Sequence, residues 1–455
     1  MLPKNLKYGS KVESAVARSY RTNIQPQNGT GPYNVTGDTI TINIPTRQNL
    51  VLVPSESYLK FKLNITSGTN ASNFRFDSCG AHGVISRIRV WSGSNLLSDI
   101  DQYGLLAKML FDMQISTDAA YGKMNVSGGT RNDLVTVQAA TFTASSGLSA
   151  IQANSGELIG GQVSVASGVV VSDTYCIPLI SLIGSLCSSN YFPLFACSSA
   201  PLRVELQLAP SVISFCAANF STANATLTNV EYIAQFIELG DAAMSAIYSS
   251  LGSEPLQMVV PDWRNYQFTS QLTAATATQV NMPIPAKFSS LKSLITTVRE
   301  KGTGVATFFP FASNSQGINQ YQFRLGSLVV PSNPPSTTQE MFMEVQKAIA
   351  SISDIAYQPS IEKSSYQQNI AVASVDSATS VSSTNSGSFY CGIDLENYSG
   401  ASKDTIFSGY NSNTDDIYWS PTFTATNTIA ACRFDAFANF DAVVVFENNT
   451  AYVKF

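Results

Sequence analysis

The chain contains one histidine, His82, in the segment Cys79-Gly80-Ala81-His82-Gly83. One histidine cannot build a multi-histidine zinc site, and a Ser-His-Asp triad would have only this residue as its base. Cys79 is a candidate nucleophile for a Cys-His pair. However, no Asn or Asp stands at a recognisable spacing to orient the imidazole. We therefore interpret His82 as a turn histidine that is hydrogen-bonded locally.

Two carboxylate pairs lie close together in the sequence, Asp99 with Asp101 and Asp415 with Asp416. The first pair is predicted to stand at a helix start, where the macrodipole stabilises negative charge. The second lies in the Asn- and Ser-rich loop 411–416, where a calcium site and solvated turn carboxylates are both open and the turn is favoured. A glycosidase or protease that uses Asp415 or Glu396 is disfavoured, because the chain has one histidine and no tight carboxylate pair suited to catalysis.

Nucleotide-binding motifs are missing from the sequence as well. No Walker A loop is present, and no G-x-G-x-x-G motif follows a strand-like run, so the Gly-Thr-Gly run at 302–304 is interpreted as a turn between strands. Trp91, Trp263 and Trp419 follow strand spacing and are predicted to lie in the core. We therefore assign no catalytic, cofactor-binding or metal-ligating residue, and we predict a protein that is not an enzyme.

Charged residues make up only 13% of the 455 residues, about half the roughly 25% that is usual for a soluble domain. The formal net charge of −5 and the pI near 5.1 argue against general nucleic-acid binding by the folded body. No stretch approaches the ~18–20 consecutive apolar residues of a membrane-spanning helix. Seven cysteines without a C-x-x-C spacing predict buried thiols in a reducing compartment rather than a disulfide framework.

Most of the chain reads as strands, because runs rich in Val, Ile, Thr, Tyr and Phe alternate with Gly, Pro, Asn and Ser clusters. The predicted strands include residues 39–44, 58–65, 84–91, 202–208, 232–239, 291–299 and 443–446. Strict alternation in 202–208 indicates a sheet with one face in water. Two segments, 99–114 and 338–349, have a helical period. Ser98 with Asp101, and Thr337 with Glu340, are predicted to form capping boxes at their starts.

Landmarks of these elements recur along the chain in the same order. The pairs are Pro45 and Pro285, Leu59 and Leu291, Gly93 and Gly326, the helix caps Ser98 and Thr337, and Val204 and Val444, at offsets of 232 to 240 residues. Their shared order indicates two copies of one β unit of roughly 200 residues, with a helix inserted between strands.

Three segments lie outside this repeat. Residues 127–168 and 373–388 are rich in small and hydroxylated residues and are predicted to form long loops or short extra strands. Residues 1–35 form a basic arm that carries Lys4, Lys7, Lys11, Arg18 and Arg21 against one glutamate. The arm could contact nucleic acid, anionic lipid or a neighbouring subunit, or it could be a solvated terminus.

Several stretches, taken in order along the chain, carry a family resemblance. They are 53–61 (VPSESYLKF), 88–94 (IRVWSGS) followed by 101–106 (DQYGLL), 177–179 (IPL) with 191–194 (YFPL), 321–326 (YQFRLG) before Pro331, and 392–396 (GIDLE). With the repeated β unit, they make the chain resemble the double-jelly-roll major capsid proteins of tailless icosahedral DNA viruses. That lineage includes Polinton-like viruses, virophages, tectiviruses and the adenovirus hexon.

The resemblance implies an all-β fold of two tandem eight-stranded jelly rolls, each with a short flanking helix. We accordingly divide the chain into a basic N-terminal arm (1–35), a first roll (36–222, with a loop insertion at 127–168) and a second roll (223–455). We expect each flanking helix to meet a neighbouring roll.

The resemblance also implies a function in assembly. Such proteins form homotrimers whose six rolls make a pseudo-hexagonal capsomer, and capsomers tile an icosahedral shell. The expected partners are neighbouring capsomers, penton or minor capsid proteins, and an internal membrane or the genome at the arm. The expected location is the virion, after synthesis in the host cytoplasm.

A second hypothesis remains open, namely a viral spike or a carbohydrate- or receptor-binding β-sandwich protein. That class would require an exposed aromatic cluster beside Asp or Asn calcium ligands, and residues 411–419 are the one stretch that resembles this pattern.

Overall fold

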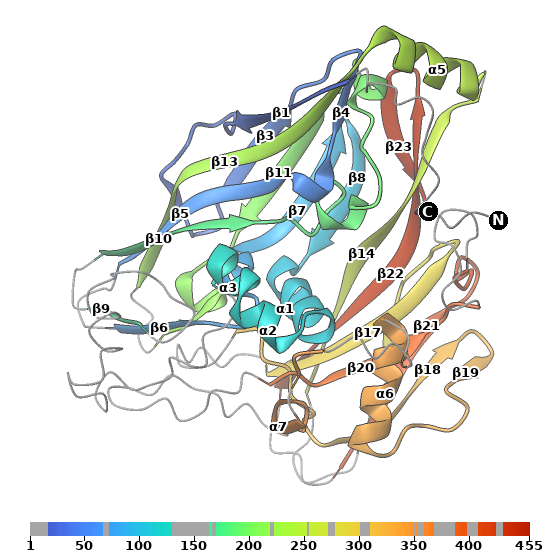
Figure 1. The fold of residues 1–455 in the computed structure, drawn as a ribbon. Helices are drawn as coiled ribbons and strands as arrows, with labels where there is room; N and C mark the ends of the chain where they lie inside the picture. The colour runs from blue at the N-terminus through green and yellow to red at the C-terminus, as the bar shows by residue number, and fades with distance from the viewer. Residues whose placement is uncertain are drawn as a thin grey trace, which may run out of the picture.

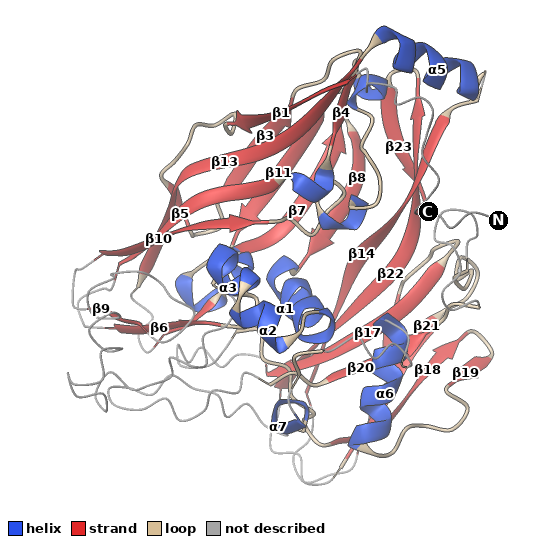
Figure 2. Cartoon of the chain, in the orientation of Figure 1, coloured by secondary structure: helices blue, strands red, loops and turns tan. Residues whose placement is uncertain are grey.

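Strands form most of the molecule and build two β units joined along one side (Figure 1). The computed structural model describes residues 17–66, 72–129, 163–165, 170–218, 223–252, 254–271, 278–300, 310–349, 352, 359–361, 363–367, 387–397, 408–424 and 431–455. Figure 2 shows short helices beside these sheets, with α1, α2 and α3 clustered near the place where the two units meet.

The first unit contains eight main strands in two sheets. They are β1 (Ala17–Ile24), β3 (Thr39–Ile44), β5 (Tyr58–Thr66), β7 (Ile85–Ser92), β8 (Asn95–Asp101), β10 (Val170–Ile177), β11 (Leu202–Leu208) and β13 (Asn224–Leu239). One sheet has the order β1-β13-β5-β10 and the other β3-β11-β7-β8, and the pairings within them are antiparallel. The short strands β2 (Tyr33–Asn34) and β4 (Leu50–Leu52) also pair with β13, and β6 (Ser72–Phe76), β9 (Val163–Val165) and β12 (Cys216–Ala218) form a small third sheet.

The second unit repeats this arrangement. Its strands are β14 (Leu256–Gln271), β15 (Thr278–Gln279), β16 (Met282–Ile284), β17 (Leu291–Glu300), β18 (Ile318–Leu325), β19 (Leu328–Val330), β20 (Tyr390–Asp394), β21 (Ile417–Phe423), β22 (Ala431–Glu447) and β23 (Thr450–Lys454). The sheet orders are β14-β22-β17-β20 and β15-β21-β18-β19, with β16 beside β15 on β21 and β23 on β22. If β15 and β16 count as one strand, both units have the order first-eighth-third-sixth in one sheet and second-seventh-fourth-fifth in the other.

The helices occupy equivalent places in the two units. Helix α1 (Tyr103–Gln114) follows the fifth strand of the first unit, and α6 (Thr338–Ile349) follows the fifth strand of the second. The remaining helices are α2 (Thr117–Tyr121), α3 (Lys123–Gly128), α5 (Asp241–Leu251) and α7 (Lys363–Tyr366), with 3₁₀ turns η2 (Pro54–Glu56), η3 (Gly80–Val84), η5 (Ser185–Cys187), η6 (Leu194–Cys197) and η7 (Val212–Ser214). Helix α5 connects the units and was not predicted, although Asp241 in its first turn and Gly252 at φ 59° after its end are ordinary helix-end signals.

Two predicted boundaries are wrong. Ala17–Ile24, assigned to the basic arm, is strand β1 and pairs with β13, from Ala17 opposite Leu239 to Ile24 opposite Tyr232. Asn224–Leu239, assigned to the second unit, pairs with both β1 and β5 and is the last strand of the first. The repeat was misaligned at this point, because 202–208 is the seventh strand of its unit and not the closing one. The first unit therefore spans 17–239, and residues 1–16 lie outside the described ranges.

Three of the five repeated landmarks fall on equivalent positions. Pro45 and Pro285 follow the second strands, Leu59 and Leu291 lie on the third, and Gly93 and Gly326 turn the fourth strand into the fifth with φ of 57° and 58°. The other two pairs are not equivalent, because Ser98 lies within strand β8 and Val204 and Val444 lie on the seventh and eighth strands.

The helix start predicted at Asp99 is also wrong. Residues 95–101 pair with β7 as β8, and α1 begins only at Tyr103, after Gln102 in the left-handed region at φ 52°. Cross-strand pairing after the Gly93 turn overrides the local capping pattern. In α6 the predicted cap is present, since the Thr337 hydroxyl accepts from the Glu340 N–H at 3.2 Å and the Glu340 carboxylate accepts from the Ser336 N–H at 3.0 Å.

One apolar cluster extends across both units. Strand β11 alternates between buried and partly exposed residues as predicted, and its buried side faces the core of the first unit. That core also takes in Trp263, Phe437 and Tyr390 from the second unit, while a separate cluster around Phe323 and Trp419 fills the second unit itself. The two β units therefore pack as one body, and their line of contact is called the seam below.

Candidate functional site

His82 is buried in η3 with only 1% of its surface exposed. Its Nδ1 lies 3.1 Å from the hydroxyl of Tyr103, which also accepts from the Ile180 N–H at 3.0 Å, and its ring packs edge-on against Phe111. The prediction of a local partner is therefore wrong, because Tyr103 belongs to α1. Burial lowers the pKa of His82 to about 3, so the ring is neutral and packs η3 against α1.

Cys79 does not form a nucleophile pair with His82. Its thiol is directed to the Gly80 carbonyl at 3.8 Å, and burial, with a further contribution from Asp77, raises its pKa well above the ordinary value. A thiolate is the reactive form of cysteine, so this site opposes that chemistry. All seven cysteines are free thiols, and all but the half-buried Cys176 are buried, as the sequence predicted.

The two carboxylate pairs are each held by protein groups. Asp99 lies on β8, not at a helix start, and accepts from Arg87 through both oxygens at 2.7 and 2.6 Å. Asp101 accepts from the Gln102 N–H at 2.8 Å. Asp99 therefore stabilises the hairpin of β7 and β8, and Asp101 stabilises the turn that leads from β8 into α1.

The loop 411–416 also has protein partners for its acids. Tyr410 donates a short hydrogen bond to Asp415, and Asp416 pairs with Lys287 at 3.1 Å. Within the described ranges no three His, Cys, Asp or Glu side chains are grouped so that they could hold a metal ion. The favoured turn interpretation therefore accounts for these residues. Glu396, the other acid considered, pairs with Lys292 at 3.0 Å.

The tryptophans follow the core prediction in part. Trp263 and Trp419 are 5% and 1% exposed, whereas Trp91 is partly exposed beneath the Arg203 guanidinium, 5.4 Å from its ring centre. The Gly-Thr-Gly run at 302–304 lies outside the described residues. None of the helices in the described ranges is long and apolar enough to cross a bilayer.

The seam, by contrast, gathers buried polar side chains from both units. Lys108 of α1 is fully buried, and its Nζ lies 2.8 Å from Asp112, 3.0 Å from Ser78 and 3.2 Å from Ser388. Asp112 also accepts from the Ser388 hydroxyl at 2.8 Å and from the Tyr390 hydroxyl at 2.9 Å. Residues 388 and 390 belong to the second unit, so this network, called the seam network, connects the two units.

Further polar contacts cross the seam, among them one made by Arg299 and one made by Ser98. Arg299 of β17 is held by Asp435 at 2.6 Å and donates to the Gln102 side chain at 3.2 Å. Ser98 of β8 donates to Asp262 of β14 at 3.0 Å. Charge-assisted bonds of this kind are strong when they are buried, and they fix the register of one unit on the other.

Apolar packing at the seam is equally close. Phe311 of the second unit lies against Gly83 and Gly104 of the first, where an added Cβ would meet its ring at 2.9 and 2.6 Å. Phe192 packs edge-on against Phe446 at 5.4 Å between ring centres. Larger residues at the two glycines would push the units apart.

An apolar groove of about 700 Å³ opens beside α5, near the end of the seam. Val51, Phe195 and Ile247 are among its lining residues, together with Leu256 of the second unit. Tyr191, which also lines the groove, is 62% exposed, and Tyr248 of α5 is 55% exposed. Exposed aromatic side chains around an apolar hollow are typical of protein contact surfaces.

The repeated strand order identifies the architecture. Eight strands in two facing sheets, connected in this order, are a jelly roll, and the chain contains two. The fold is a double jelly roll. The sequence-based prediction of the fold class is thus confirmed, and each β unit is called a roll from here on.

Comparisons with known proteins agree with this architecture. The chain is similar to the PBCV-1 virus capsid protein structure (TM-score 0.61, 9% identity, covering 99% of this chain and 100% of that one). It is also similar to the Sputnik virophage structure, with a TM-score of 0.59 and 13% identity over 100% of this chain and 91% of that one. The mavirus major capsid protein gives a TM-score of 0.56 and 12% identity over 100% of this chain and 93% of that one. No family model and no curated protein sequence matches. Identities this low establish a shared fold.

The seam network was missed by sequence reasoning. Lys108 and Asp112 stand one helical turn apart, which from sequence alone resembles an exposed ion pair. The available signal was the apolar composition around them, because Leu105, Leu106 and Met109 leave α1 without a clearly polar face.

Proposed function

We propose that this protein is the major capsid protein of an icosahedral virus, with a structural and not a catalytic role. The observation that carries the proposal is the match of the whole double jelly roll, both rolls and their connection, to the mavirus major capsid protein and the PBCV-1 capsid over more than nine-tenths of each chain. Two rolls fused through one core make a rigid block, which is the property that a shell subunit requires.

Three such chains would place six rolls around one axis and form a pseudo-hexagonal capsomer. The seam supports this arrangement, because shared apolar packing and hydrogen bonds between the rolls fix the angle between them. A fixed angle allows a closed, symmetric trimer to form in a single geometry. Neighbouring capsomers, and penton or minor capsid proteins, would then contact the outer surfaces.

The low charge and the exposed apolar side chains fit such contacts. Tyr191, Tyr248, Leu328 and Val329 are between 41% and 62% exposed, and the last two lie on the edge strand β19. Interfaces between subunits favour aromatic and apolar groups and are depleted in lysine and glutamate. A protein whose sides are covered by copies of itself needs few charged residues there.

The basic N-terminal segment is proposed to face the inside of the virion and to contact an internal membrane or the genome. Its described part, β1, presents Arg18 and Arg21 beside the rings of Tyr20 and Tyr58. The other proposed class, a carbohydrate- or receptor-binding sandwich, gains no support from 411–419, because Trp419 is buried there and the acids are paired.

The test is the assembly state of the purified full chain. Light scattering should give three times the 48.8 kDa chain mass, and negative-stain micrographs should show particles with a hexagonal outline. A stable monomer at micromolar concentration would contradict the proposal. Specific glycan binding by such a monomer would favour the receptor-binding class instead.

A further inference from the structure

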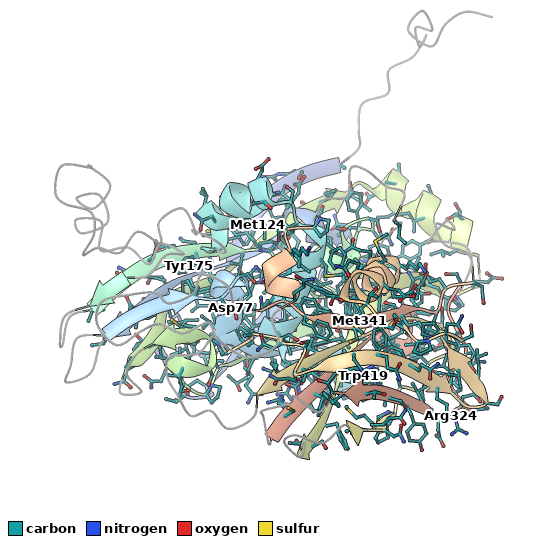
Figure 3. The ribbon with its side chains drawn as sticks, turned by 90° about the horizontal axis from the view of Figure 1, so that it is seen from below. Asp77, Met124, Tyr175, Arg324, Met341 and Trp419 are labelled. Atoms are coloured by element: carbon teal, nitrogen blue, oxygen red, sulfur yellow. The ribbon has the colours of Figure 1, made fainter. Side chains whose placement is uncertain are left out.

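A lysine and two aspartates are enclosed together beside the seam. The Lys108 Nζ lies 2.8 Å from Asp112 Oδ2 and 3.4 Å from Asp77 Oδ1, and each of the three side chains is at most 1% exposed. Asp77 follows strand β6 and lies near the middle of the molecule in Figure 3, while Lys108 and Asp112 come from α1. The amine therefore touches one carboxylate of its own helix and one from a distant turn.

The two carboxylates have different surroundings. Asp112 Oδ2 is fixed by hydroxyl groups, Ser388 at 2.8 Å and Tyr390 at 2.9 Å. Asp77 Oδ1 accepts from the Ser78 N–H at 2.7 Å, whereas its Oδ2 is buried with no hydrogen-bond partner among the described residues. A buried carboxylate oxygen without a hydrogen-bond partner costs free energy, so a reaction that removes Asp77 Oδ2 would remove an unsatisfied polar atom.

The site is also enclosed. Burial raises the pKa of the adjacent Cys79 thiol well above its usual range, and it does the same for the Tyr390 hydroxyl that contacts Asp112. An enclosed site keeps bulk water away from the reacting groups. It also favours condensation, because the water that is released leaves for bulk solvent.

We propose that Lys108 and Asp77 condense to an intramolecular amide bond, with Asp112 as the base. The Lys108 Nζ lies 3.4 Å from Asp77 Oδ1, so the amine is held beside the carboxyl group that it would attack. Asp112 touches the nucleophile directly, and the Ser78 N–H is placed to stabilise the charge that develops on Asp77 Oδ1.

The step balances without any co-reactant. The Lys108 ammonium gives one proton to Asp112, and the freed amine attacks Asp77 Cγ. Negative charge collects on Oδ1, and the C–Oδ2 bond then breaks. Oδ2 leaves as water with two protons, one returned by Asp112 and one from the attacking nitrogen. The nitrogen keeps its third proton as the amide N–H, so one water is released and Asp112 ends as it began.

The bond would tie α1 to the turn after β6, between residues that are 31 positions apart in the sequence. A cross-link of this kind restricts the unfolded chain and stabilises the folded one, as a disulfide does in proteins that leave the cell. It would also remove a charged pair from the interior while leaving Asp112 bonded to the second roll. This inference goes beyond the proposed capsid function, and its test does not depend on the assembly state.

The test is mass spectrometry of the full chain, denatured after native purification. The intact mass should be one water below the mass calculated from the sequence. Trypsin should fail to cleave at Lys108 and should release one branched peptide that joins residues 76–87 to 90–123. A folded chain of full mass that yields linear peptides would overturn the proposal. So would the loss of one water with normal cleavage at Lys108, which indicates a succinimide at Asp77.

Three matched variants test the assignment of each role. Lys108→Met keeps the apolar stem and should have full mass, and Asp112→Asn should keep the fold but lose most of the cross-linked species. Asp77→Asn should still react and lose one ammonia instead of one water. If Asp77→Asn lost one water, the acceptor would be Asp112 and the proposal would be overturned. Circular dichroism of each variant verifies the fold.

Discussion

At the scale of the residue, Asp262 makes the seam sensitive to pH. Its carboxylate is 4% exposed and accepts from Ser98 and from the Trp263 N–H, and burial raises its pKa from 3.8 to about 7. The folded state therefore binds this proton more tightly than the unfolded chain. The contribution of this proton to the stability of the folded state is fully present below about pH 4 and is lost as the pH rises through 7.

We expect Asp262→Asn to remove this dependence, because the amide oxygen can keep both hydrogen bonds without a charge. A pKa shift of one unit corresponds to about 1.4 kcal/mol. The difference in free energy of unfolding between wild type and variant should therefore change by at most about 4 kcal/mol between pH 4 and pH 7. Urea unfolding at several pH values measures it. Asp416→Asn removes an exposed charge away from the seam and is the control. Parallel pH profiles for wild type and Asp262→Asn would contradict the expectation.

Residue identities alone could not predict which side chains would matter. Lys108 and Asp112 resemble an ordinary surface pair until residues 388 and 390, nearly 280 positions away, close over them. His82 likewise has its partner in Tyr103, which the chain brings near only when α1 packs on η3. Local pattern carries no information about such contacts, because they depend on how the two rolls dock.

At the scale of the element, the start of α6 gives a clean test of capping. Thr337 accepts from the Glu340 N–H at 3.2 Å, and both residues are exposed, so little else depends on them. We expect Thr337→Ala to destabilise the protein by about 1 kcal/mol and Thr337→Ser to restore most of that loss. Thr338→Ala, one residue into the helix, is the matched control. Equal thermal unfolding of the two alanine variants would show that the cap contributes nothing.

The elements themselves were largely predictable where pattern and pairing agree. Residues 39–44 and 202–208 are strands as expected, and 338–349 is a helix between its predicted ends. Prediction failed where a strand runs directly into a helix, as at 95–114, because the local cap pattern of Ser98 competes with cross-strand pairing to β7. It failed again at 224–239, where the closing strand must return beside β1, a pairing over more than 200 residues.

At the scale of the whole molecule, the shared core predicts that the two rolls unfold together. Trp263 and Phe437 of the second roll lie in the same cluster as Phe61 of the first, and Arg299 bonds across the seam to Gln102. The second roll also has a cluster of its own around Phe323 and Trp419. Because the shared cluster couples the packing of the two rolls, we expect one unfolding transition. Each roll is thus a separate unit in its strand connections, whereas the two rolls together are expected to unfold as one cooperative unit.

The tryptophans make this expectation measurable. Replacing Trp91 and Trp263 by Phe leaves Trp419 to report on the cluster of the second roll. Replacing Trp263 and Trp419 by Phe leaves Trp91 to report on the first roll. In each variant the fluorescence transition in urea should coincide with the transition followed by circular dichroism, which reports on both rolls. Phe61→Ala, a truncation in the core of the first roll that costs about 3–5 kcal/mol, should lower both midpoints equally. If only the Trp91 signal moved, the rolls would be independent domains, and the rigid seam required by the proposed capsomer would be absent.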